Sequence, residues 1–486
     1  MSKTTTIVFF LILLLIGVLS YKDYGISWDE PIQRKFGLAV FNYIFNGSDQ
    51  MFKSSEKYYG PVFEFILVVV EKVLNLTLEK EIYQIRHLFT FIFNFVGYIF
   101  FYKLTQKAFK NRFLSLTAVS FLAFSPLFFA HSFYNSKDAV LMSGVIIASY
   151  FSLKFLKDPR AKNALLAGFF CALAITIRIA GIFVPVITLL ILIPNFKIAK
   201  IKPLLFYILS VIVFTFILWP LLWNNPVKEF TNAFNEMKRF HETSSTVFLG
   251  RTITGDKIPW FYIPLWMMIT IPYTQVLLFV SGVLTAFKSK IEKTYKLYFI
   301  LWFFLPLITI IFLKSTLYDG WRQMFFIYPG FILISICGLE YVLDSKVTIV
   351  KVFVIALVCV NLAQAVLFIN KWHPNQNVFF NFLAGGKANI SGKFSLDYWG
   401  LVYKQLYDYI ADSDEREQII IYVDTFPGET NLKVSKTPQK FILSESVVNS
   451  DYFLTNFRSG VVLEESKKVY KVAVDGVEIG AVYKVN

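Results

Sequence analysis

Long apolar segments separated by short polar ones fill the first three quarters of the chain. Each is roughly 16–26 residues long, enough for a helix to cross a hydrocarbon core of about 30 Å. We expect about eleven membrane-spanning helices. Their approximate bounds are residues 7–21, 86–104, 114–131, 139–156, 163–178, 179–196, 203–222, 262–287, 297–313, 324–343 and 349–368. The pattern predicts a polytopic α-helical membrane protein.

The run from Tyr59 to Leu76 is apolar but carries Pro61, Glu64, Glu71 and Lys72. A lipid-exposed span carrying these charges would be costly to insert. We therefore expect an amphipathic helix on the outer membrane surface, within a long first outer loop over residues 22–85.

Lysine and arginine clusters fall on alternate loops, which fixes the expected orientation. The clusters are Lys3; Lys103, Lys107, Lys110 and Arg112; Lys154, Lys157, Arg160 and Lys162; Lys197, Lys200 and Lys202; and Lys288, Lys290, Lys293 and Lys296. The side that carries them is expected to be cytoplasmic, with the N-terminus. An odd number of spans then places the C-terminal tail outside.

The long apolar segments end at about residue 370, and the pattern beyond it is that of a soluble domain. We therefore expect two domains, 1–369 in the membrane and 370–486 outside it. Residues 418–423, 440–443, 469–474 and 478–485 have strand patterns, and 403–410 has a helix pattern. Asp475-Gly476 between the last two strands predicts a tight hairpin. We expect a small extracytoplasmic α/β domain.

Composition agrees with a membrane protein: 56% of residues are hydrophobic and 17% are charged. The formal charge of +15 does not indicate nucleic acid, because the tail has about 13 basic and about 14 acidic residues and the excess lies between spans. Three scattered cysteines predict neither a disulfide framework nor a metal site.

Few charges lie at span ends on the expected outer face, and they come from five separate segments. They are Asp29, Glu30, Arg86, His87, Lys137, Asp138, Arg178, Asp319 and Arg322. Ionisable groups near or within a membrane are candidates for function, although capping a span end is the ordinary alternative.

One chemistry suits this set: transfer of a sugar from a polyprenyl phosphate. A carboxylate can deprotonate the acceptor hydroxyl, and fixed cations can stabilise the departing phosphate. Asp29 is the candidate base. Arg178 and Arg322 are the preferred phosphate ligands because guanidinium groups bind phosphate bidentately, with Lys137 and Arg86 as further cations. The remaining substrate-binding candidates are Trp28, Tyr58, Tyr59, His87, Asp319, Trp321, His373, Asp397 and Trp399.

Several short motifs occur in an order that resembles a known family. They are the acidic pair after the first span, Tyr59-Gly60-Pro61, Ser125-Pro126, Asn135-Ser136-Lys137-Asp138 and Ala174-Ile175-Thr176-Ile177-Arg178. Over roughly residues 1–370 the chain resembles the GT-C membrane glycosyltransferases, specifically the family-39-like branch with protein O-mannosyltransferases and the lipid A aminoarabinose transferase. Trp219 to Trp223, Tyr318 to Arg322, and His373 to Gly400 resemble a bacterial subgroup of that branch.

The resemblance implies that Asp29 is the catalytic base, that Asp138 shapes the site, and that transfer inverts the anomeric centre. Glu30 remains an alternative base. No cofactor is expected, but oligosaccharyltransferases of this fold hold a divalent metal between such acidic residues, so a cation near Asp29 and Asp138 stays open. The implied location is the bacterial cytoplasmic membrane, with the active site extracytoplasmic.

The implied partners are a polyprenyl-phosphate-linked donor, membrane lipids, and a glycan, lipid or protein acceptor, but no nucleic acid. The tail is expected to cover the site or select the acceptor, since His373, Asp397 and Trp399 adjoin the membrane. Two other function classes are a transporter or flippase of lipid-linked glycans and a membrane scaffold. A transporter would have charges at the bilayer centre and repeated halves, and the sequence has neither.

Overall fold

The structure is a computed structural model that describes residues 2–195, 201–239 and 244–485. Up to residue 371 it is mainly helical. The helices of the first half are α1 (Lys3–Ser20), α2 (Asp29–Asn46), α3 (Gln50–Lys53), α4 (Val62–Val73), α5 (Glu79–Phe109), α6 (Arg112–Ala123), α7 (Pro126–Tyr134), α8 (Asp138–Lys157), α9 (Ala161–Ile177), α10 (Phe183–Leu192) and α11 (Ile201–Leu218). They are followed by α12 (Pro226–Arg239), α13 (Tyr262–Thr270), α14 (Tyr273–Thr285), α15 (Lys293–Leu313), α16 (Tyr328–Leu343) and α17 (Thr348–Lys371).

All eleven expected spans coincide with helices, but fewer are full-length spans. Among the described residues seven helices are long and apolar enough to cross a membrane, and the pair α6 and α7, bent by 65°, would make an eighth. The other three are the shorter apolar helices α9, α10 with its preceding turn, and α14. Two breaks explain the difference: Arg178 is extended between α9 and α10, and Pro272 separates α13 from α14. Lys197 and Lys200 lie outside the described residues.

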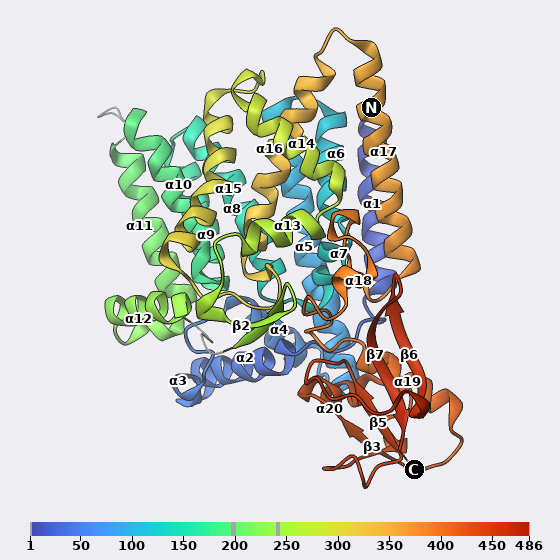
Figure 1. Ribbon diagram of the computed structural model, residues 1–486. Helices are drawn as coiled ribbons and strands as arrows, with labels where there is room; N and C mark the ends of the chain where they lie inside the picture. Colours follow the sequence, from blue (N-terminus) through green and yellow to red (C-terminus); the bar gives the residue numbers. More distant parts are fainter. Residues whose placement is uncertain (1, 196–200, 240–243, 486) are drawn as a thin grey trace.

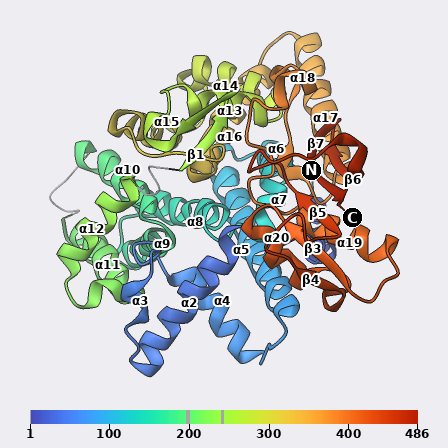
Figure 2. The same ribbon diagram turned by 60° about the horizontal axis from the view of Figure 1, so that its bottom comes forward.

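The long helices run side by side, and the larger segments between them lie at one end (Figure 1). The first loop with α2 and α4, the helix α12 and the C-terminal sheet lie together there, whereas the N-terminus lies at the opposite end. Figure 2 shows the C-terminal sheet beside α5 and α7 from this side. This placement agrees with the expected separation of the two termini.

The helix expected near residues 59–76 is α4, and it does not pass the test for a span. It packs against α2, α5 and α9. Its acidic residues face the protein and not the aqueous surface, because Glu64 and Glu71 are buried against Arg86 of α5. The helix expected on the membrane surface therefore buries its two acidic residues within the protein, whereas Lys72 is exposed.

The tail forms a five-stranded mixed sheet in the order β4-β3-β5-β7-β6. Its strands are β3 (Ile419–Val423), β4 (Phe441–Leu443), β5 (Tyr452–Thr455), β6 (Lys468–Val474) and β7 (Val477–Lys484). β3 pairs in parallel with β4 and β5, and β7 pairs antiparallel with β5 and β6. The helix α19 (Tyr403–Ser413) buries Leu406, Tyr407 and Ile410 against this sheet.

The predicted hairpin joins β6 and β7. Asp475 and Gly476 both have positive φ, 47° and 79°, as a type I′ turn requires. Sequence analysis missed β5, the helices α18 (Lys387–Ile390) and α20 (Phe426–Asn431), and the hairpin of β1 (Ser245–Phe248) with β2 (Arg251–Thr254). These elements are short, and none has a long alternating pattern.

Candidate active site

Asp29 and Glu30 are separated by the way α2 begins. The Ser27 N–H donates to Glu30 Oε2 at 2.7 Å, and Glu30 N–H donates to Ser27 O at 3.2 Å. Glu30 therefore folds back over the helix start, as in a capping box. Its other oxygen lies 2.9 Å from His87 Nε2, and it is buried. Asp29, one residue earlier, is not held in this way and lines a pocket that Glu30 does not line.

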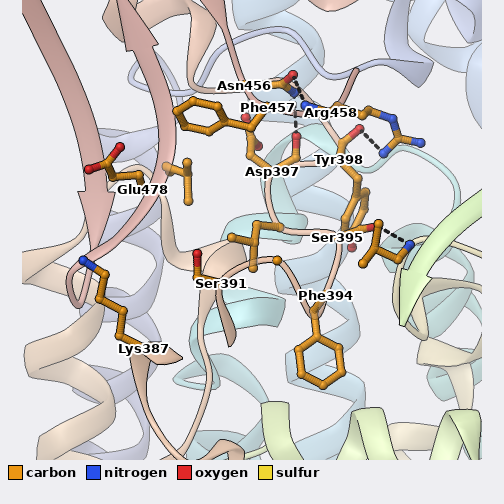
Figure 3. Close-up of a pocket in the computed structure, with 14 residues that line it drawn as sticks. Lys387, Ser391, Phe394, Ser395, Asp397, Tyr398, Asn456, Phe457, Arg458 and Glu478 are labelled. Atoms are coloured by element: carbon orange, nitrogen blue, oxygen red, sulfur yellow. Dashed lines mark hydrogen bonds between the residues drawn. The ribbon is translucent and has the colours of Figure 1, made fainter. Parts of the chain in front are cut away.

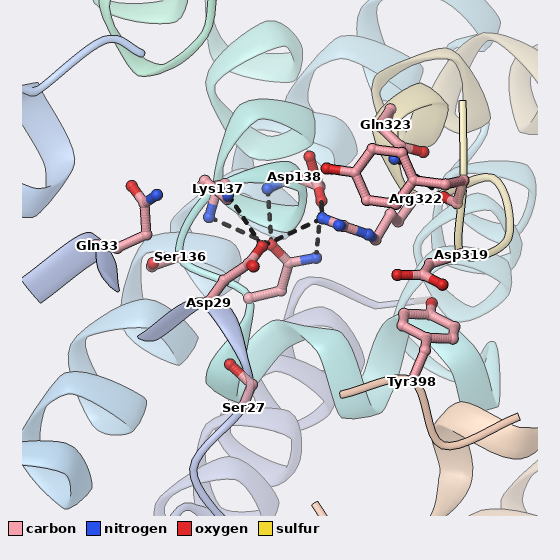
Figure 4. Close-up of polar contacts among 12 residues, drawn as sticks. Ser27, Asp29, Gln33, Ser136, Lys137, Asp138, Asp319, Arg322, Gln323 and Tyr398 are labelled. Carbon is pink, nitrogen blue, oxygen red and sulfur yellow. Dashed lines mark hydrogen bonds and ion pairs between the residues drawn. The ribbon is translucent and has the colours of Figure 1, made fainter. Parts of the chain in front are cut away.

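Asp29 and Asp138 lie in a cluster with Lys137 and Arg322 (Figure 4), and Arg178 is the third cation. Lys137 Nζ is 2.9 Å from Asp29 Oδ2. Arg322 Nη1 lies between the carboxylates, 3.3 Å from Asp29 Oδ2 and 3.2 Å from Asp138 Oδ2. Arg178 pairs with the other oxygen of Asp138. Three cations and two carboxylates give the cluster one excess positive charge.

The turn before α8 is held by Asn135. Its Oδ1 accepts the backbone N–H groups of Lys137 at 3.2 Å and Asp138 at 2.8 Å. This is the local bonding that makes Asn frequent in turns. The turn thereby presents Lys137 and Asp138 to the cluster from adjacent positions.

The cations determine the charge state of Asp29. Burial raises the pKa of Asp29, but Lys137 and Arg322 outweigh it and lower the pKa to about 2. Burial lowers the pKa of Lys137, and Asp29 more than compensates, so that it is raised. Asp29 is thus ionised near neutral pH and Lys137 stays charged.

Asp29 faces a pocket of about 280 Å³. The lining residues are Trp28, Asp29, Ile32, Glu56, Lys137, Ser244, Tyr318, Asp319, Arg322, Tyr398, Trp399 and Arg458. The Asp29 side chain is 20% exposed, whereas that of Asp138 is 1% exposed and its oxygens are occupied by Arg178, Arg322 and Asn135. Asp29 is therefore the accessible carboxylate of the cluster.

Aromatic rings hold the cations in place. The Arg322 guanidinium lies 4.7 Å from the Trp399 ring centroid and 5.0 Å from that of Tyr318. Lys137 and Arg178 lie 4.6 and 5.2 Å from the Tyr59 ring. Such contacts favour the charged form of each cation. Tyr59 and Trp399 thus support the cations, and Trp28 and Trp399 also line the pocket.

Several predicted site residues lie outside this pocket. Arg86 is buried between Glu64 and Glu71, so its guanidinium is already paired. His87 contacts Glu30, and His373 Nε2 is 2.8 Å from Asp23. Trp321 is buried and donates to Thr270 Oγ1 at 2.9 Å.

Two further predicted residues have structural contacts. Tyr58 packs beside the buried Trp219 cluster. Asp397 accepts the backbone N–H groups of Leu401 and Val402 at 3.3 and 3.1 Å. Burial raises the pKa of Asp397 to about 6, against the opposing effect of those N–H groups.

Sequence analysis missed residues that the tail brings to the pocket. Arg458, after β5, donates to both carboxylate oxygens of Asp319 at 3.1 Å and lies 5.3 Å from the Trp28 ring. Its signal was slight: it is one of two arginines after residue 370. Glu56 and Tyr398 also line the pocket.

Asn431 of α20 fixes the segment before Asp29 from the tail. Its Oδ1 accepts the Ile26 N–H at 2.9 Å, and its Nδ2 donates to Ile26 O at 2.8 Å. At Gly25 a Cβ would lie 2.4 Å from Asn431 Oδ1, so this close approach requires glycine. The tail therefore helps to support the loop that carries Asp29.

Comparison with known proteins identifies the fold. Residues 59–223 match the family model of dolichyl-phosphate-mannose-protein mannosyltransferases. The structure of ArnT from Cupriavidus metallidurans bound to undecaprenyl phosphate aligns with a TM-score of 0.52 at 12% identity, over 99% of this chain and 98% of ArnT. The chain has the GT-C glycosyltransferase fold. No curated protein matches it by sequence.

Two larger structures share the GT-C fold with this chain. The Archaeoglobus fulgidus oligosaccharyltransferase aligns with a TM-score of 0.53 at 11% identity, over 89% of this chain and 64% of its own. The mycobacterial arabinofuranosyltransferase AftD aligns with a TM-score of 0.51 at 11% identity, over 100% and 40%. The chain thus spans less than two thirds of either protein, but nearly all of ArnT.

Proposed function

We propose that this protein transfers a sugar from a polyprenyl-phosphate donor to an acceptor hydroxyl, with Asp29 as the base. The observation that carries the proposal is that Asp29 is the exposed carboxylate of a cluster whose cations, Lys137 and Arg322, share its pocket. The GT-C fold supports the proposal. The match to the mannosyltransferase family model and the undecaprenyl phosphate bound in the ArnT structure support this class of donor.

In the proposed reaction the acceptor oxygen forms a bond to the anomeric carbon. The bond from that carbon to the phosphate oxygen breaks, its electron pair stays on the phosphate, and the hydroxyl proton passes to Asp29. Lys137 and Arg322 stabilise the charge that develops on the phosphate. Asp138 is enclosed by its cations and is therefore not free to act as a second catalytic carboxylate. We accordingly assign a single displacement, which inverts the anomeric centre.

The same cations would also regulate the basicity of Asp29. With a pKa of about 2, Asp29 is a weak base while Lys137 and Arg322 bind it. A donor phosphate would take over part of their contacts and raise the Asp29 pKa towards the range useful for catalysis. Donor binding would therefore activate the base.

The chemistry needs no metal step in this proposal. Arg178, Arg322 and Lys137 already outnumber the two carboxylates and bind their oxygens, so we infer that the donor set around Asp29 and Asp138 does not suit a divalent cation. We place the site at the outer face of the bacterial cytoplasmic membrane. The basic residues Lys107, Lys154 and Lys157 line a separate surface pocket that does not include Asp29. Basic residues favour the cytoplasmic side, which supports an extracytoplasmic position for Asp29.

The test is Asp29→Asn with Glu30→Gln as the matched control. Full-length protein in lipid nanodiscs is supplied with undecaprenyl-phosphate-linked hexoses, pentoses and aminopentoses and a cell-envelope extract as acceptor. We expect Asp29→Asn to lower transfer by about 10²–10⁴-fold with donor binding retained, and Glu30→Gln to lower it less. Unchanged transfer by Asp29→Asn would reject the base assignment. Donor translocation without transfer by the wild type would favour a flippase.

A further inference from the structure

A second and larger pocket of about 450 Å³ adjoins the site at the tail (Figure 3). It lies between the segment 387–398, the β1 strand and the tail sheet. It shares two lining residues, Tyr398 and Arg458, with the pocket of Asp29. The Asp319–Arg458 ion pair therefore stands where the two pockets meet.

The lining of this outer pocket combines aromatic faces with both kinds of hydrogen-bonding group. Phe394, Phe457 and Tyr398 are the rings. Lys387 and Glu478 lie on one side of the view and Arg458 on the other (Figure 3). Ser391 and Lys387 have no side-chain hydrogen bond to other described residues. Rings that stack on apolar faces, beside mixed donors and acceptors, suit a polyhydroxylated ligand.

Backbone strain marks the junction of the two pockets. Asp319 has φ of 54° and Phe457, next to Arg458, has φ of 62°. The left-handed region is uncommon for non-glycine residues and unfavourable for a bulky aromatic, so the surroundings must impose it. Asp319 is one member of the Asp319–Arg458 contact, and Phe457 directly precedes the other member and lines the outer pocket.

Along segment 393–395 the pocket offers no free backbone edge for an extended peptide. The Ser395 N–H donates to Val247 O at 3.1 Å, and Lys393 O accepts the Gly250 N–H at 3.1 Å. The segment 393–395 is thus already bonded to the β1–β2 hairpin. Recognition by strand addition would need such an edge. The lining therefore favours a ligand bound through side chains.

We propose that this outer pocket is the acceptor subsite and that the acceptor is a saccharide. The inference rests on the proposed function, since it assigns the second substrate of the Asp29 site. The sugar rings lie against Phe457, and the attacking hydroxyl reaches Asp29 past the Asp319–Arg458 pair.

The test compares Ser391→Trp, which fills the pocket from an exposed position, with Ser413→Trp at an exposed tail position outside the lining. Full-length proteins in nanodiscs are probed with an array of short neutral and anionic oligosaccharides, with unstructured peptides, and separately with undecaprenyl phosphate. We expect Ser391→Trp to weaken saccharide binding by at least about tenfold and to keep undecaprenyl phosphate binding within about twofold. Ser413→Trp should keep both.

The saccharide and peptide probes test the acceptor assignment, whereas undecaprenyl phosphate tests the proposed function. If the wild type binds undecaprenyl phosphate but binds peptides or no saccharide, or if Ser391→Trp binds saccharides normally, the acceptor assignment is overturned. If the wild type fails to bind undecaprenyl phosphate, the proposed function itself is overturned, whatever the array shows.

Discussion

At the scale of single residues, the main feature is a carboxylate held ionised by its neighbours. Lys137 and Arg322 lower the pKa of Asp29 to about 2 although burial acts in the opposite direction. Because this pKa lies below the unfolded value of about 4, the ion pairs stabilise the fold above about pH 4 and that contribution is lost as the pH falls towards 2. In the proposed mechanism the same contacts limit Asp29 as a base until a donor phosphate shares them.

This arrangement predicts different acid limbs for the two kinetic parameters. The profile of kcat/KM for the donor reports the free enzyme and should stay flat on the acid side down to about pH 4. The profile of kcat reports the donor complex, and its acid limb should lie at higher pH. Both profiles would be measured with one lipid-linked donor at saturating acceptor. A kcat limb at the same pH as, or below, that of kcat/KM would contradict the proposed activation.

At the scale of elements, α4 organises the outer end of the bundle. Glu64 and Glu71 bind Arg86 of α5, and Glu64 also accepts from Ser136 Oγ, beside Lys137. The loop before α4 approaches α9 closely, since a Cβ on Gly60 would lie 1.9 Å from Thr176 O. The helix thus connects the first loop, the turn before α8 and the end of α9.

Replacing Arg86 with Leu should remove the buried guanidinium that Glu64 and Glu71 share, so that Glu64 keeps only a hydroxyl partner, Ser136, and Glu71 keeps Arg34. We expect the free energy of unfolding to fall by about 3–5 kcal/mol. The matched control is Arg160→Leu, because Arg160 is 79% exposed and, among the described residues, forms an ion pair only with Asp158; its effect should stay within about 0.5 kcal/mol. Denaturant titration in one detergent measures both. Loss of undecaprenyl phosphate binding by Arg86→Leu at unchanged stability would instead make Arg86 a phosphate ligand.

At the scale of the whole molecule, the tail and the helical bundle build one site. Arg458 binds Asp319 and covers Trp28, while the Trp28 N–H donates to Trp399 O at 3.0 Å. Asn431 fixes the backbone of Ile26 through both of its side-chain groups. The position of Asp29 therefore depends on tail residues that are distant in sequence.

We predict that Asn431→Asp lowers kcat about 10- to 100-fold, since it removes the bonds donated to Ile26, Pro427 and Gly400 without changing the side-chain size. Undecaprenyl phosphate binding should stay within about twofold, because Lys137 and Arg322 are not moved. The control is Asn449→Asp at an exposed tail position. Equal losses of kcat and of lipid phosphate binding would indicate general unfolding and contradict a positioning role.

The sequence predicted much of the fold and the centre of the cluster for one physical reason. Apolar length and the loop charges decide which segment ends share a face, and this brought Asp29, Asp138, Arg178 and Arg322 together. The misplaced residues depended on partners that periodicity does not reveal. Arg86 was assigned to phosphate because it lies at a span end on the expected outer face, and its pairing with Glu64 and Glu71 could not be read from the sequence. Arg458 and Asn431 were missed because their positions follow from how the tail docks.

The two hydrogen bonds by which Asn431 clamps the backbone of Ile26 have a consequence for biosynthesis. Ile26 belongs to one of the first segments that the ribosome makes, and its clamp lies 405 residues later in the chain. A nascent chain can insert every helix of the bundle while the loop that carries the proposed base, Asp29, still lacks this support. The enzyme would therefore become competent only after its tail has crossed the membrane and folded, so that incomplete chains leave the lipid-linked sugar pool intact.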